Sequence, residues 1–566
     1  MPSNSNLKTL LDITTHSFSA FSECTLVANV DGDEITYAQA KEKMETLQEL
    51  LISLGIEQGD KVAICSENMP HWGIAYLAIT SMGAVAVPIL PDFHSNEIHH
   101  IVKHSEAKVI FVSKKMINKI SEDDFTSSLQ FVISLETFTQ LDDYTKKSEL
   151  LTKGSERFAQ LKAKLTKPEQ QKEVNDVIIS EDDLAVIIYT SGTTGQSKGV
   201  MLSHRNLVFQ MKQAKGLIVI TEKDRFLSIL PLAHTLECSV GFLVPFSNGA
   251  SVYYINRTPA PKIILKAMAT VKPTCILSVP LVIEKIYKSK VQASFNKNAV
   301  IKYLYNNVAF VRKKLNKIAG KKLHESFGGE VRFFGIGGAK LSPFVEQFLQ
   351  EANFPYAVGY GLTETAPLIA GAIPGNTKMG TTGVIVEGME HRFVKYGQES
   401  HDAELHVRGP NVMMGYYKDT ARTEEVLDAD GWFNTGDLGC MDENGVLSIN
   451  GRSKNVIIGA SGENIYPESI ESVLNQNVLV SDSLVYELDG RVVAKIHIDY
   501  DLFDETHNIQ KSSDSALHTE ILTILEEIKN EANSQLASFS KIASVFEQTE
   551  PFIKTPTKKI KRFLHI

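Results

Sequence analysis

The stretch YTSGTTGQSKGV, residues 189–200, continues directly from the apolar run LAVIIY (Leu184–Tyr189). Its three glycines allow backbone N–H groups to converge on an anion, its hydroxyls add donors, and Lys198 supplies a positive charge. The spacing is not that of a Walker A motif, because Gly195 precedes Lys198 by three residues and Gly199 follows it. A flexible turn is the alternative for any cluster of Gly, Ser and Thr. We interpret the stretch as a strand followed by a loop that wraps a triphosphate.

Composition narrows the class of protein. At 566 residues the chain is too long for one compact core, so we expect two or more domains. With 43% hydrophobic and 22% charged residues it is typical of a globular protein, and the formal charge of −9 argues against a nucleic-acid partner. The five cysteines are scattered and show no C-x-x-C spacing, and the first residues lack a secretory pattern. These features predict a cytoplasmic protein without disulfides or a zinc site.

One uncharged segment, Gly73–Leu90, approaches the length of a membrane span. Pro88 near its end, its two glycines and the pair Thr80–Ser81 instead favour a buried helix that turns into a strand.

Apolar spacing predicts that strands alternate with helices. Residues 36–54 fit an amphipathic helix with Thr36 as N-cap and Gly55 as its stop, whereas Lys61–Cys65 and Lys108–Ser113 are typical of buried strands. Residues 114–180 are polar, and we expect a solvated, partly helical excursion there. The alternation resumes at residue 181 and predicts an α/β fold with parallel sheets.

The end of the chain has a different pattern. Short strand-like pieces such as AELHVRG and GVLSING lead to a predicted boundary near Gly451–Lys454. Beyond it we expect a hairpin turned at Asp489–Gly490, then a helix with Ile521, Leu525, Ile528 and Ala532 on one face. This pattern predicts a small α+β unit.

Eight segments in one order resemble the acyl-adenylate-forming enzymes, a superfamily of acyl-CoA synthetases, peptide-synthetase adenylation domains and luciferases. The segments are YTSGTTGQSKGVMLSH, LPLAHTLE (Leu230–Glu237), GGAKLS (Gly337–Ser342), GYGLTET (Gly359–Thr365), GWFNTGDLG (Gly431–Gly439), GRSKNVII (Gly451–Ile458), GENIYPESIE (Gly462–Glu471) and KTPTKKIKR (Lys554–Arg562).

The resemblance implies two domains. Residues 1–450 would form a large domain of βαβ subdomains with mixed sheets and a distorted β-barrel, and residues 451–566 a small mobile α+β cap. Segments such as Ser278–Tyr287, Val311–Glu325 and Gly337–Leu349 look most like long-chain acyl-CoA synthetases. Such an enzyme attacks the α-phosphate of ATP with a fatty carboxylate, releases pyrophosphate, and passes the acyl group to CoA.

The resemblance also implies roles for particular residues. Thr363 would contact the α-phosphate, Glu364 would ligate Mg²⁺, and Asp437 would accept the ribose hydroxyls, although loop acids and turn-forming aspartates are common. The implied ATP- and AMP-binding set is Thr190, Ser191, Gly192, Thr193, Thr194, Gly195, Lys198, Gly338, Ala339, Tyr360, Gly361, Thr363, Asp437 and Arg452.

The tail and the cap carry the remaining implied residues. Lys559 would stabilise charge between the carboxylate and the α-phosphate, although Lys558 stands where glycine is usual and leaves the register open by one lysine. His234 would gate the acyl pocket unless it is merely structural, and Lys454 would be the hinge of the cap. Gly462, Glu463 and Asn464 would face the site only in the thioester step.

Two other functions fit the motifs. The enzyme could stop at acyl-AMP or load the phosphopantetheine of a carrier protein, or the chain could be a non-catalytic nucleotide-binding homologue. The latter would have broken motifs, yet Lys198, Glu364, Asp437, Arg452 and Lys559 are all present. We therefore expect a cytoplasmic Mg²⁺- and ATP-dependent ligase, with peripheral contact to membranes as an open expectation.

Overall fold

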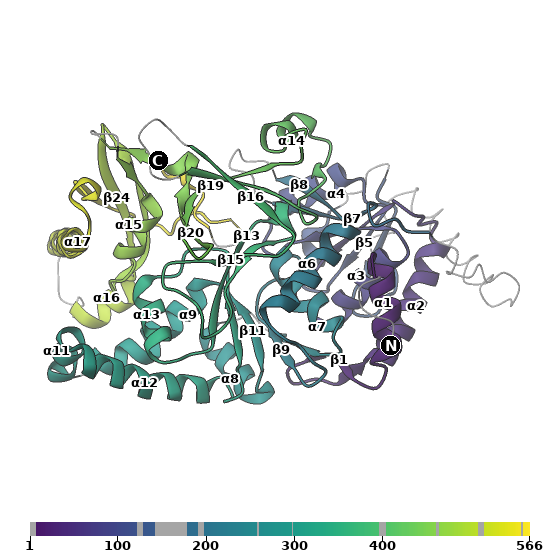
Figure 1. Ribbon diagram of the computed structural model, residues 1–566, viewed down its shortest axis with the longest axis horizontal. Coiled ribbons are helices and arrows are strands. Elements are labelled where there is room, and N and C mark those ends of the chain that lie inside the picture. Colours follow the sequence, from purple (N-terminus) through teal and green to yellow (C-terminus); the bar gives the residue numbers. More distant parts are fainter. Residues whose placement is uncertain are drawn as a thin grey trace, which may run out of the picture.

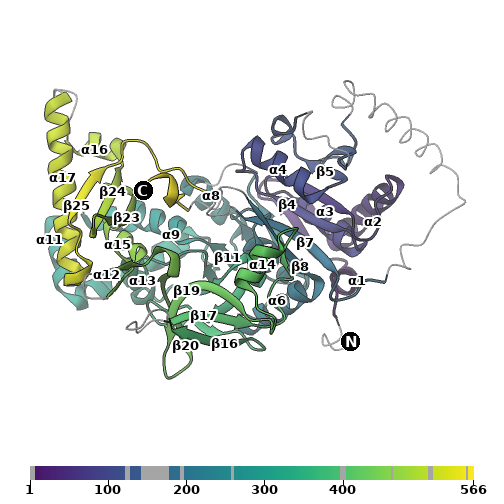
Figure 2. The same cartoon turned by 90° about the horizontal axis from the view of Figure 1, so that it is seen from above.

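The structure of the protein, a computed structural model, describes residues 7–121, 128–141, 178–190, 197–256, 260–296, 298–395, 403–459, 463–507, 514–555 and 559–566. The N-terminal elements lie at one end of the molecule and the C-terminal unit at the other (Figures 1 and 2). The two large hydrophobic cores are separate: one runs from Leu10 to Leu447, the other from Ile457 to Ile542, and a small third cluster around Leu484 and Phe552 lies in the C-terminal unit. The gap between the two large cores matches the predicted boundary, while the domain assignments 1–450 and 451–566 stay predictions.

A seven-stranded sheet holds the phosphate-loop segment at one of its ends. Strands β7, β4, β3, β5 and β6 are parallel, whereas β8 pairs antiparallel with β7 and β18 with β8. The strand order is β18 (Gly415–Tyr416), β8 (Lys198–Ser203), β7 (Leu184–Thr190), β4 (Val85–Ile89), β3 (Lys61–Cys65), β5 (Val109–Val112) and β6 (Phe131–Ser134). The buried strands predicted at Lys61–Cys65 and Lys108–Ser113 are confirmed as β3 and β5.

The helix predicted over residues 36–54 is confirmed as α2 (Tyr37–Ser53). The Thr36 side chain accepts from the Gln39 backbone N–H, and the Gln39 side chain accepts from the Thr36 N–H, which satisfies two amides at the helix start. The helix ends before Gly55, which adopts a φ of 80°. The other helices around this sheet are α1 (Leu10–Ala20), α3 (Pro70–Ser81), α4 (Ser95–Ser105) and α6 (His204–Leu217).

The uncharged segment Gly73–Leu90 forms a helix and a strand, as predicted. It supplies most of α3 and all of β4, and both elements are buried. Within the described residues, we find no helix with the length and apolar character needed to span a bilayer.

The prediction of a solvated, partly helical segment over residues 114–180 is wrong in part. β6 (Phe131–Ser134) lies inside it and pairs in parallel with β5, with Phe131, Val132 and Ile133 buried. Four residues are too short for the alternation of apolar and polar positions to stand out in a charged neighbourhood. Residues 122–127 and 142–177 lie outside the described part of the chain.

A second, thirteen-stranded sheet changes from parallel to antiparallel along its width. Strands β1, β10, β9, β11, β12 and β13 are parallel, the strands beyond β13 are antiparallel, and β2 pairs antiparallel with β1 at the other end. The order is β16 (Glu390–Lys395), β17 (Ala403–Arg408), β19 (Phe433–Met441), β20 (Val446–Arg452), β15 (Gly383–Ile385), β14 (Leu368–Gly371), β13 (Tyr356–Gly361), β12 (Phe333–Ile336), β11 (Cys275–Ser278), β9 (Arg225–Ser228), β10 (Ser251–Tyr254), β1 (Thr25–Asn29) and β2 (Glu34–Thr36). The predicted α/β class with mixed sheets is confirmed.

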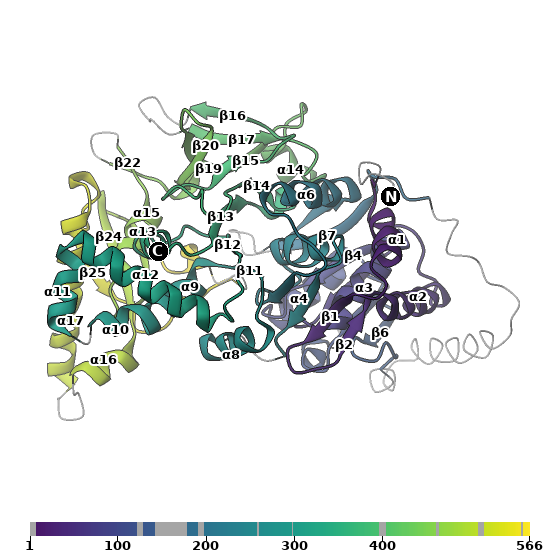
Figure 3. The ribbon, with the colours of Figure 1, turned by 60° about the horizontal axis from the view of Figure 1, so that its bottom comes forward.

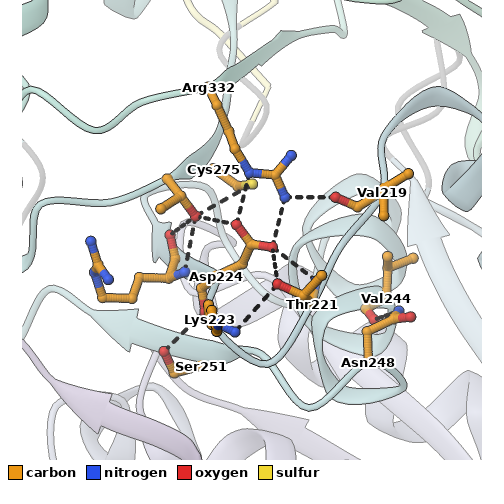
Figure 4. A network of polar contacts seen from close by, with 11 residues as sticks. Val219, Thr221, Lys223, Asp224, Val244, Asn248, Ser251, Cys275 and Arg332 are labelled. Atoms are coloured by element: carbon orange, nitrogen blue, oxygen red, sulfur yellow. Dashed lines mark hydrogen bonds and ion pairs between the residues drawn. The ribbon is translucent and has the colours of Figure 1, made fainter.

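A polar clamp ties the amino ends of four parallel strands together (Figure 4). Asp224, buried just before β9, accepts from the Arg332 guanidinium at 2.9 and 2.6 Å and from the Thr274 hydroxyl at 2.7 Å. The Asp224 carbonyl also accepts from Ser251 at the start of β10. Thr274 precedes β11 and Arg332 precedes β12. The clamp therefore fixes the amino ends of these parallel strands and leaves their carboxyl ends available for a binding site.

Helices follow the parallel strands and continue into an insert along one side of the molecule. The insert is shown at the lower edge of Figure 1 and comes forward in Figure 3. These helices are the π-helical η6 (Glu237–Leu243), α7 (Val244–Phe246), α8 (Pro261–Val271), α9 (Pro280–Ile286), the π-helical η7 (Tyr287–Gln292), α10 (Ala293–Asn296), α11 (Ala299–Asn307), α12 (Ala309–Ser326) and α13 (Pro343–Glu351); α14 (Thr420–Val426) lies between β18 and β19 in sequence.

The C-terminal unit has the predicted α+β form. Asp489 and Gly490, with φ of 51° and 71°, turn the hairpin between β23 (Val480–Leu488) and β24 (Arg491–Ile498). The expected apolar face, Ile521 to Ala532, is buried on α17 (Asp514–Gln535). The other elements are β21 (Ile457–Ile458), β22 (Asn464–Ile465), α15 (Pro467–Leu474), α16 (Tyr500–His507) and β25 (Ser544–Glu547).

Candidate active site

Thr190 and Lys198 flank the glycine-rich loop at the ends of two paired strands. Thr190 ends β7, Lys198 begins β8, and the two residues lie opposite each other in the antiparallel ladder. The hydroxyls of Thr190 and Ser197 are buried and have no hydrogen-bond partner among the described residues. Unpartnered hydroxyls beside an ammonium suit an anionic oxygen ligand. Ser191, Gly192, Thr193, Thr194 and Gly195 of the predicted set lie outside the described residues.

Glu364 connects this loop to the loop after β13. Its Oε1 lies 3.1 Å from Lys198 Nζ and accepts from the Tyr416 hydroxyl at 2.9 Å. Burial alone would raise the pKa of Glu364, but the charge of Lys198 and the hydrogen bonds around the carboxylate hold that pKa below its ordinary value. Glu364 is therefore an ionised oxygen donor, which is the chemistry that a magnesium ion prefers.

Gly361 determines how the next residues are placed. A Cβ atom at this position would lie 1.7 Å from the carbonyl oxygen of Pro367, so no side chain fits. The Leu362 N–H donates to that same carbonyl, which closes the turn. The tight turn leads into the short 3-10 helix η8 (Thr363–Thr365), where Thr363 is half-buried beside Glu364.

Tyr360, Asp437 and Arg452 form a second polar group. The Tyr360 hydroxyl donates to Asp437 Oδ2 at 2.6 Å, and Arg452 Nε lies 2.8 Å from Asp437 Oδ1. Asp437 and Arg452 are register partners on β19 and β20. Desolvation raises the pKa of Asp437, whereas the charge of Arg452 and the Tyr360 hydroxyl oppose that rise. Desolvation works against the Arg452 guanidinium, but the charge of Asp437 in turn raises the pKa of Arg452. The buried acceptor has two oxygens, as the predicted binding of vicinal hydroxyls requires.

Gly338 and Ala339 lie in the loop after β12 and are exposed. Gly338 has a φ of 85°, and Gly337 has only Leu236 and the Gly359 carbonyl near its absent side chain. These residues add little side-chain bulk to the loop, and their contact with a flat base stays a prediction.

His234 lies in the loop that follows β9. Its Nδ1 accepts from the Leu236 N–H at 3.3 Å. Desolvation, followed by the nearby charge of Lys559, lowers the pKa of His234 to about 4. The ring is therefore neutral at physiological pH, and the charge of the tail lysine contributes to that state.

Lys559 reaches the same region from the opposite end of the sequence. Desolvation by the surrounding protein and the charge of Arg452 lower its pKa, while Asp437 and Glu364 oppose that shift. The ammonium keeps contact with solvent, yet it interacts electrostatically with acids from β19 and η8. Two residues away, Lys561 Nζ lies 3.9 Å from Glu97 of α4. The structure thus brings the tail against the large unit.

The predicted hinge and thioester residues lie apart from this charged group. Lys454 is exposed in the 3-10 turn η9 (Ser453–Asn455), between the two hydrophobic cores. Glu463 and Asn464 lie in the β21–β22 hairpin, where the Gly459 N–H donates to the Glu463 carbonyl. Glu463 is not among the charges that shift the pKa of Glu364 or Asp437. Gly462 lies outside the described residues, so the roles of these residues stay predictions.

Tyr416 is a site residue that the sequence did not indicate. Its hydroxyl accepts from Lys198 and donates to Glu364, and Lys198 Nζ lies 4.0 Å from the centroid of its ring. Only the pairing of β18 with β8 brings it there. A tyrosine in a two-residue strand carries no chemical pattern that could have identified it.

A family model described as AMP-binding enzyme matches residues 18–417. A long-chain-fatty-acid–CoA ligase of Mycobacterium bovis is 30% identical, over 94% of this chain and 91% of its own. Long-chain-fatty-acid–CoA ligase 5 of Rattus norvegicus is 31% identical, over 93% and 82%. A chloroplastic long-chain-fatty-acid–[acyl-carrier-protein] ligase of Arabidopsis thaliana is 28% identical, over 94% and 81%.

Solved structures agree on the fold. An anthranilate CoA ligase in complex with anthranoyl-AMP superposes with a TM-score of 0.74 at 19% identity, covering 98% of this chain and 96% of its own. An o-succinylbenzoate coenzyme A synthetase of Bacillus subtilis, in complex with ATP and a magnesium ion, gives a TM-score of 0.72 at 22% identity, covering 97% and 98%.

Proposed function

The chain belongs to the AMP-binding enzyme family, and we propose that it activates a long-chain fatty acid with ATP and then transfers the acyl group to CoA. In the first half-reaction a carboxylate oxygen bonds to the α-phosphorus, and the bond to the departing pyrophosphate breaks. In the second half-reaction the CoA thiol displaces AMP. Relatives named long-chain-fatty-acid–CoA ligases, similar over almost the whole chain, support this substrate and acceptor.

One observation carries the proposal: Lys198 forms an ion pair with Glu364, and Lys559 from the tail interacts electrostatically with the same acid. Both reactants of the first half-reaction are anions, so the site must offset their repulsion and align them in line. We assign Lys198, with the hydroxyls of Thr190 and Ser197, to the β- and γ-phosphates. Lys559 then stabilises the charge that develops between the carboxylate and the α-phosphate.

Glu364 is the residue that we assign to Mg²⁺, with Thr363 beside it at the α-phosphate. A bound magnesium ion would supply Lewis acidity to the phosphate oxygens, and one carboxylate with phosphate and water ligands suffices for it. The described residues contain no cluster of three or more His, Cys, Asp or Glu that could hold a metal. Lys198 and Tyr416 keep the Glu364 carboxylate ionised and oriented.

The nucleoside and the acyl chain occupy the two sides of this centre in our proposal. Asp437, held by Arg452 and Tyr360, accepts the ribose hydroxyls, and the small residues Gly338 and Ala339 admit the adenine. His234, neutral and next to Lys559, closes the entrance of the acyl pocket. Rotation about Lys454 would bring Gly462, Glu463 and Asn464 to the thiol.

Transfer to a carrier protein is a second candidate, because a chloroplastic relative is named as an acyl-carrier-protein ligase. The site geometry described above serves either acceptor, since adenylation is common to both. A cytoplasmic location is likewise a proposal, supported by the five cysteines, none of which forms a disulfide in the described part of the chain.

The decisive experiment measures pyrophosphate release and thioester formation with a series of saturated fatty acids. It is run with CoA, with a phosphopantetheinylated carrier protein, and with neither. We expect turnover with CoA and a preference that rises with chain length, because each buried methylene contributes about 0.8 kcal/mol. Turnover with the carrier alone would transfer the assignment to the second candidate, and the absence of fatty-acid-dependent pyrophosphate release would refute both.

A further inference from the structure

The loop that carries His234 is bound by a side chain from the other large sheet. Asn68 lies between β3 of the seven-stranded sheet and α3, whereas the loop follows β9 of the thirteen-stranded sheet. The Asn68 Nδ2 donates to the Leu230 carbonyl at 2.6 Å and to the Ser228 hydroxyl at 2.9 Å. The Asn68 Oδ1 accepts from the Leu232 N–H at 2.8 Å. One amide group, with two donor hydrogens and an acceptor, therefore holds the first part of the loop at three places.

Backbone hydrogen bonds continue from this part of the loop to His234. The His234 N–H donates to the carbonyl of Pro231 at 2.9 Å, and Pro231 stands between the two residues whose backbone Asn68 binds. On the other side, the His234 carbonyl accepts from the Cys238 N–H at 3.0 Å at the start of η6. The position of His234 thus depends on how Asn68 holds the loop.

The two elements next to Asn68 and His234 are packed closely against each other. A Cβ atom at Gly73 of α3 would lie 2.5 Å from the ring of Phe242 in η6. The side chains of Tyr76 on α3 and Cys238 on η6 also hydrogen-bond to each other. Because α3 begins just after Asn68 and η6 begins just after the loop, this packing fixes Asn68 relative to the loop.

Glu237, the first residue of η6, adds a second connection. Its carboxyl is buried and hydrogen-bonds to the side chain of Ser228, the same hydroxyl that accepts from Asn68. Burial raises the pKa of Glu237 to about 8, so the carboxyl is mostly neutral at neutral pH. Ser228 therefore joins the beginning of the loop to its end.

We propose that Asn68 is a positioning residue for the acyl half of the site: it fixes the loop so that His234 stays at the entrance of the acyl pocket. The proposal rests on the role given to His234 in the proposed function and adds a residue that acts through it. Asn68 reaches His234 only through the backbone of the loop. A loop without these hydrogen bonds would let water reach the imidazole ring and would leave the entrance open.

Steady-state kinetics with a fatty acid and ATP test the effect on the reaction. We expect Asn68→Ala to raise the KM for the fatty acid by about tenfold, the scale of one lost buried hydrogen bond, and to leave the KM for ATP unchanged. In a His234→Ala background the same change should add little, because residues that act as one unit are not additive. Additive effects in the double variant, or equal changes in both KM values, overturn the proposal.

Asn248→Ala is the matched control for the kinetics. It removes an amide that donates to the Val244 carbonyl at 2.6 Å and to the Ser247 hydroxyl at 3.1 Å, outside the loop. Both KM values should stay at those of the unmodified protein. A rise in the KM for the fatty acid as large as that of Asn68→Ala would show that any lost amide produces the effect, and would also overturn the proposal.

The titration of His234 gives a second test that needs no substrate. Histidines are labelled with ¹³C and observed by NMR between about pH 5.5 and 8, and His234→Gln identifies the signal. In the unmodified protein this signal should not titrate, because burial and the charge of Lys559 lower the pKa of His234 to about 4. In Asn68→Ala the pKa should rise toward the ordinary value of about 6.5, because water then reaches the ring.

Asn68→Leu keeps the volume of the side chain and loses all three hydrogen bonds, so it repeats the titration test in a chain whose packing is preserved. A His234 signal that still fails to titrate in both Asn68 variants overturns the proposal. Since the titration uses neither fatty acid nor ATP, it tests the position of His234 by itself. Absence of fatty-acid-dependent pyrophosphate release in the unmodified protein would instead refute the ligase proposal.

Discussion

Lys559 interacts with charged residues that precede it by more than a hundred positions in the sequence. The charges of Arg452, Asp437 and Glu364 shift the pKa of its ammonium. The charge of Lys559 in turn lowers the pKa of His234. A cation held between two acids and a neutral histidine is available for a new negative charge, because none of the described residues pairs with it in an ion pair at close range. This is the property that charge stabilisation in adenylation requires.

Replacing Lys559 therefore separates the two half-reactions. We expect Lys559→Ala to lower pyrophosphate release by about 10²–10³, the usual effect of losing one charge-stabilising contact. Thioester formation from supplied acyl-AMP should be spared, because that step has no phosphate–carboxylate charge to stabilise. Both are measured in single-turnover assays. Lys558→Ala is the matched control and should adenylate normally; the opposite pattern would move the role to Lys558, which lies outside the described residues.

The site residues that follow motif spacing could be predicted, and those that depend on tertiary pairing could not. Glu364, Asp437 and Arg452 were expected from short segments, and the structure brings them within reach of Lys198 and Lys559. Tyr416 was missed because its contact with Lys198 spans 218 positions and arises only when β18 pairs with β8. Its position follows from sheet order, which local patterns do not encode.

At the scale of elements, Asp224 joins the amino ends of β9, β10, β11 and β12. Burial works to raise the pKa of Asp224, but hydrogen bonds from Arg332, Thr221 and Thr274 hold it below the ordinary value. A carboxyl whose pKa is lower in the folded state than in the unfolded chain stabilises the protein at pH values above its unfolded pKa of about 4. This stabilisation is lost as the pH falls through the folded pKa. The contribution of the clamp to the free energy of unfolding should accordingly decrease at acidic pH.

Asp224→Asn tests the clamp. We expect a loss of roughly 2–3 kcal/mol in the free energy of unfolding at neutral pH, since the variant leaves Arg332 without its buried partner while part of the guanidinium stays in solvent. The loss should narrow as the pH falls below the unfolded pKa of about 4 and through the lowered folded pKa, because the native carboxyl is then also protonated. Urea unfolding at several pH values measures it. Glu330→Gln, which removes the exposed partner of Arg225, should cost less than about 1 kcal/mol; an equal loss would contradict the clamp.

His204 makes the contact between α1 and α6 sensitive to pH. Its Nδ1 accepts from the Leu10 N–H at 3.2 Å, and burial lowers its pKa to about 4. Between an unfolded pKa of about 6.5 and the folded value, only the unfolded chain binds the proton, so stability falls as the pH drops through this window. His204→Gln should remove up to about 3 kcal/mol of that pH dependence. Urea titrations at pH values across the window measure it, and the exposed His391→Gln should leave the slope unchanged.

The elements with strong periodicity were predictable, and those defined by pairing were not. Helix α2 and the hairpin at Asp489–Gly490 follow from capping residues and from a turn that needs positive φ. β6 was missed because its apolar residues are few and its burial comes from β5. The Asp224 clamp was likewise invisible, since its partners lie 50 and 108 positions away along the chain.

For the whole molecule, the sequence predicted two units, and the structure shows how they meet. Besides the tail at Lys559, the N-terminal unit contacts the C-terminal unit through Lys288 of η7. Its Nζ donates to the Asn475 carbonyl at 2.6 Å and to the Asn477 carbonyl at 3.4 Å, just beyond the end of α15. A lysine at a helix C-terminus satisfies free carbonyls and the negative end of the helix dipole. This contact stabilises the arrangement in which Lys559 lies in the site.

Removing Lys288 should therefore bias the enzyme against adenylation. We expect Lys288→Met, which keeps the length of the side chain, to slow pyrophosphate release by up to about tenfold, because a charged hydrogen bond of about 1.5 kcal/mol favours this arrangement. The thioester step from supplied acyl-AMP should be unchanged or faster, since a cap that rotates as we predict would leave the Lys288 contact. Single-turnover rates of the two steps measure the split. Lys290→Met, exposed in the same π-helical segment, is the control and should alter neither rate. If Lys288→Met slows both steps equally, the contact contributes to stability alone and does not select between arrangements of the two units.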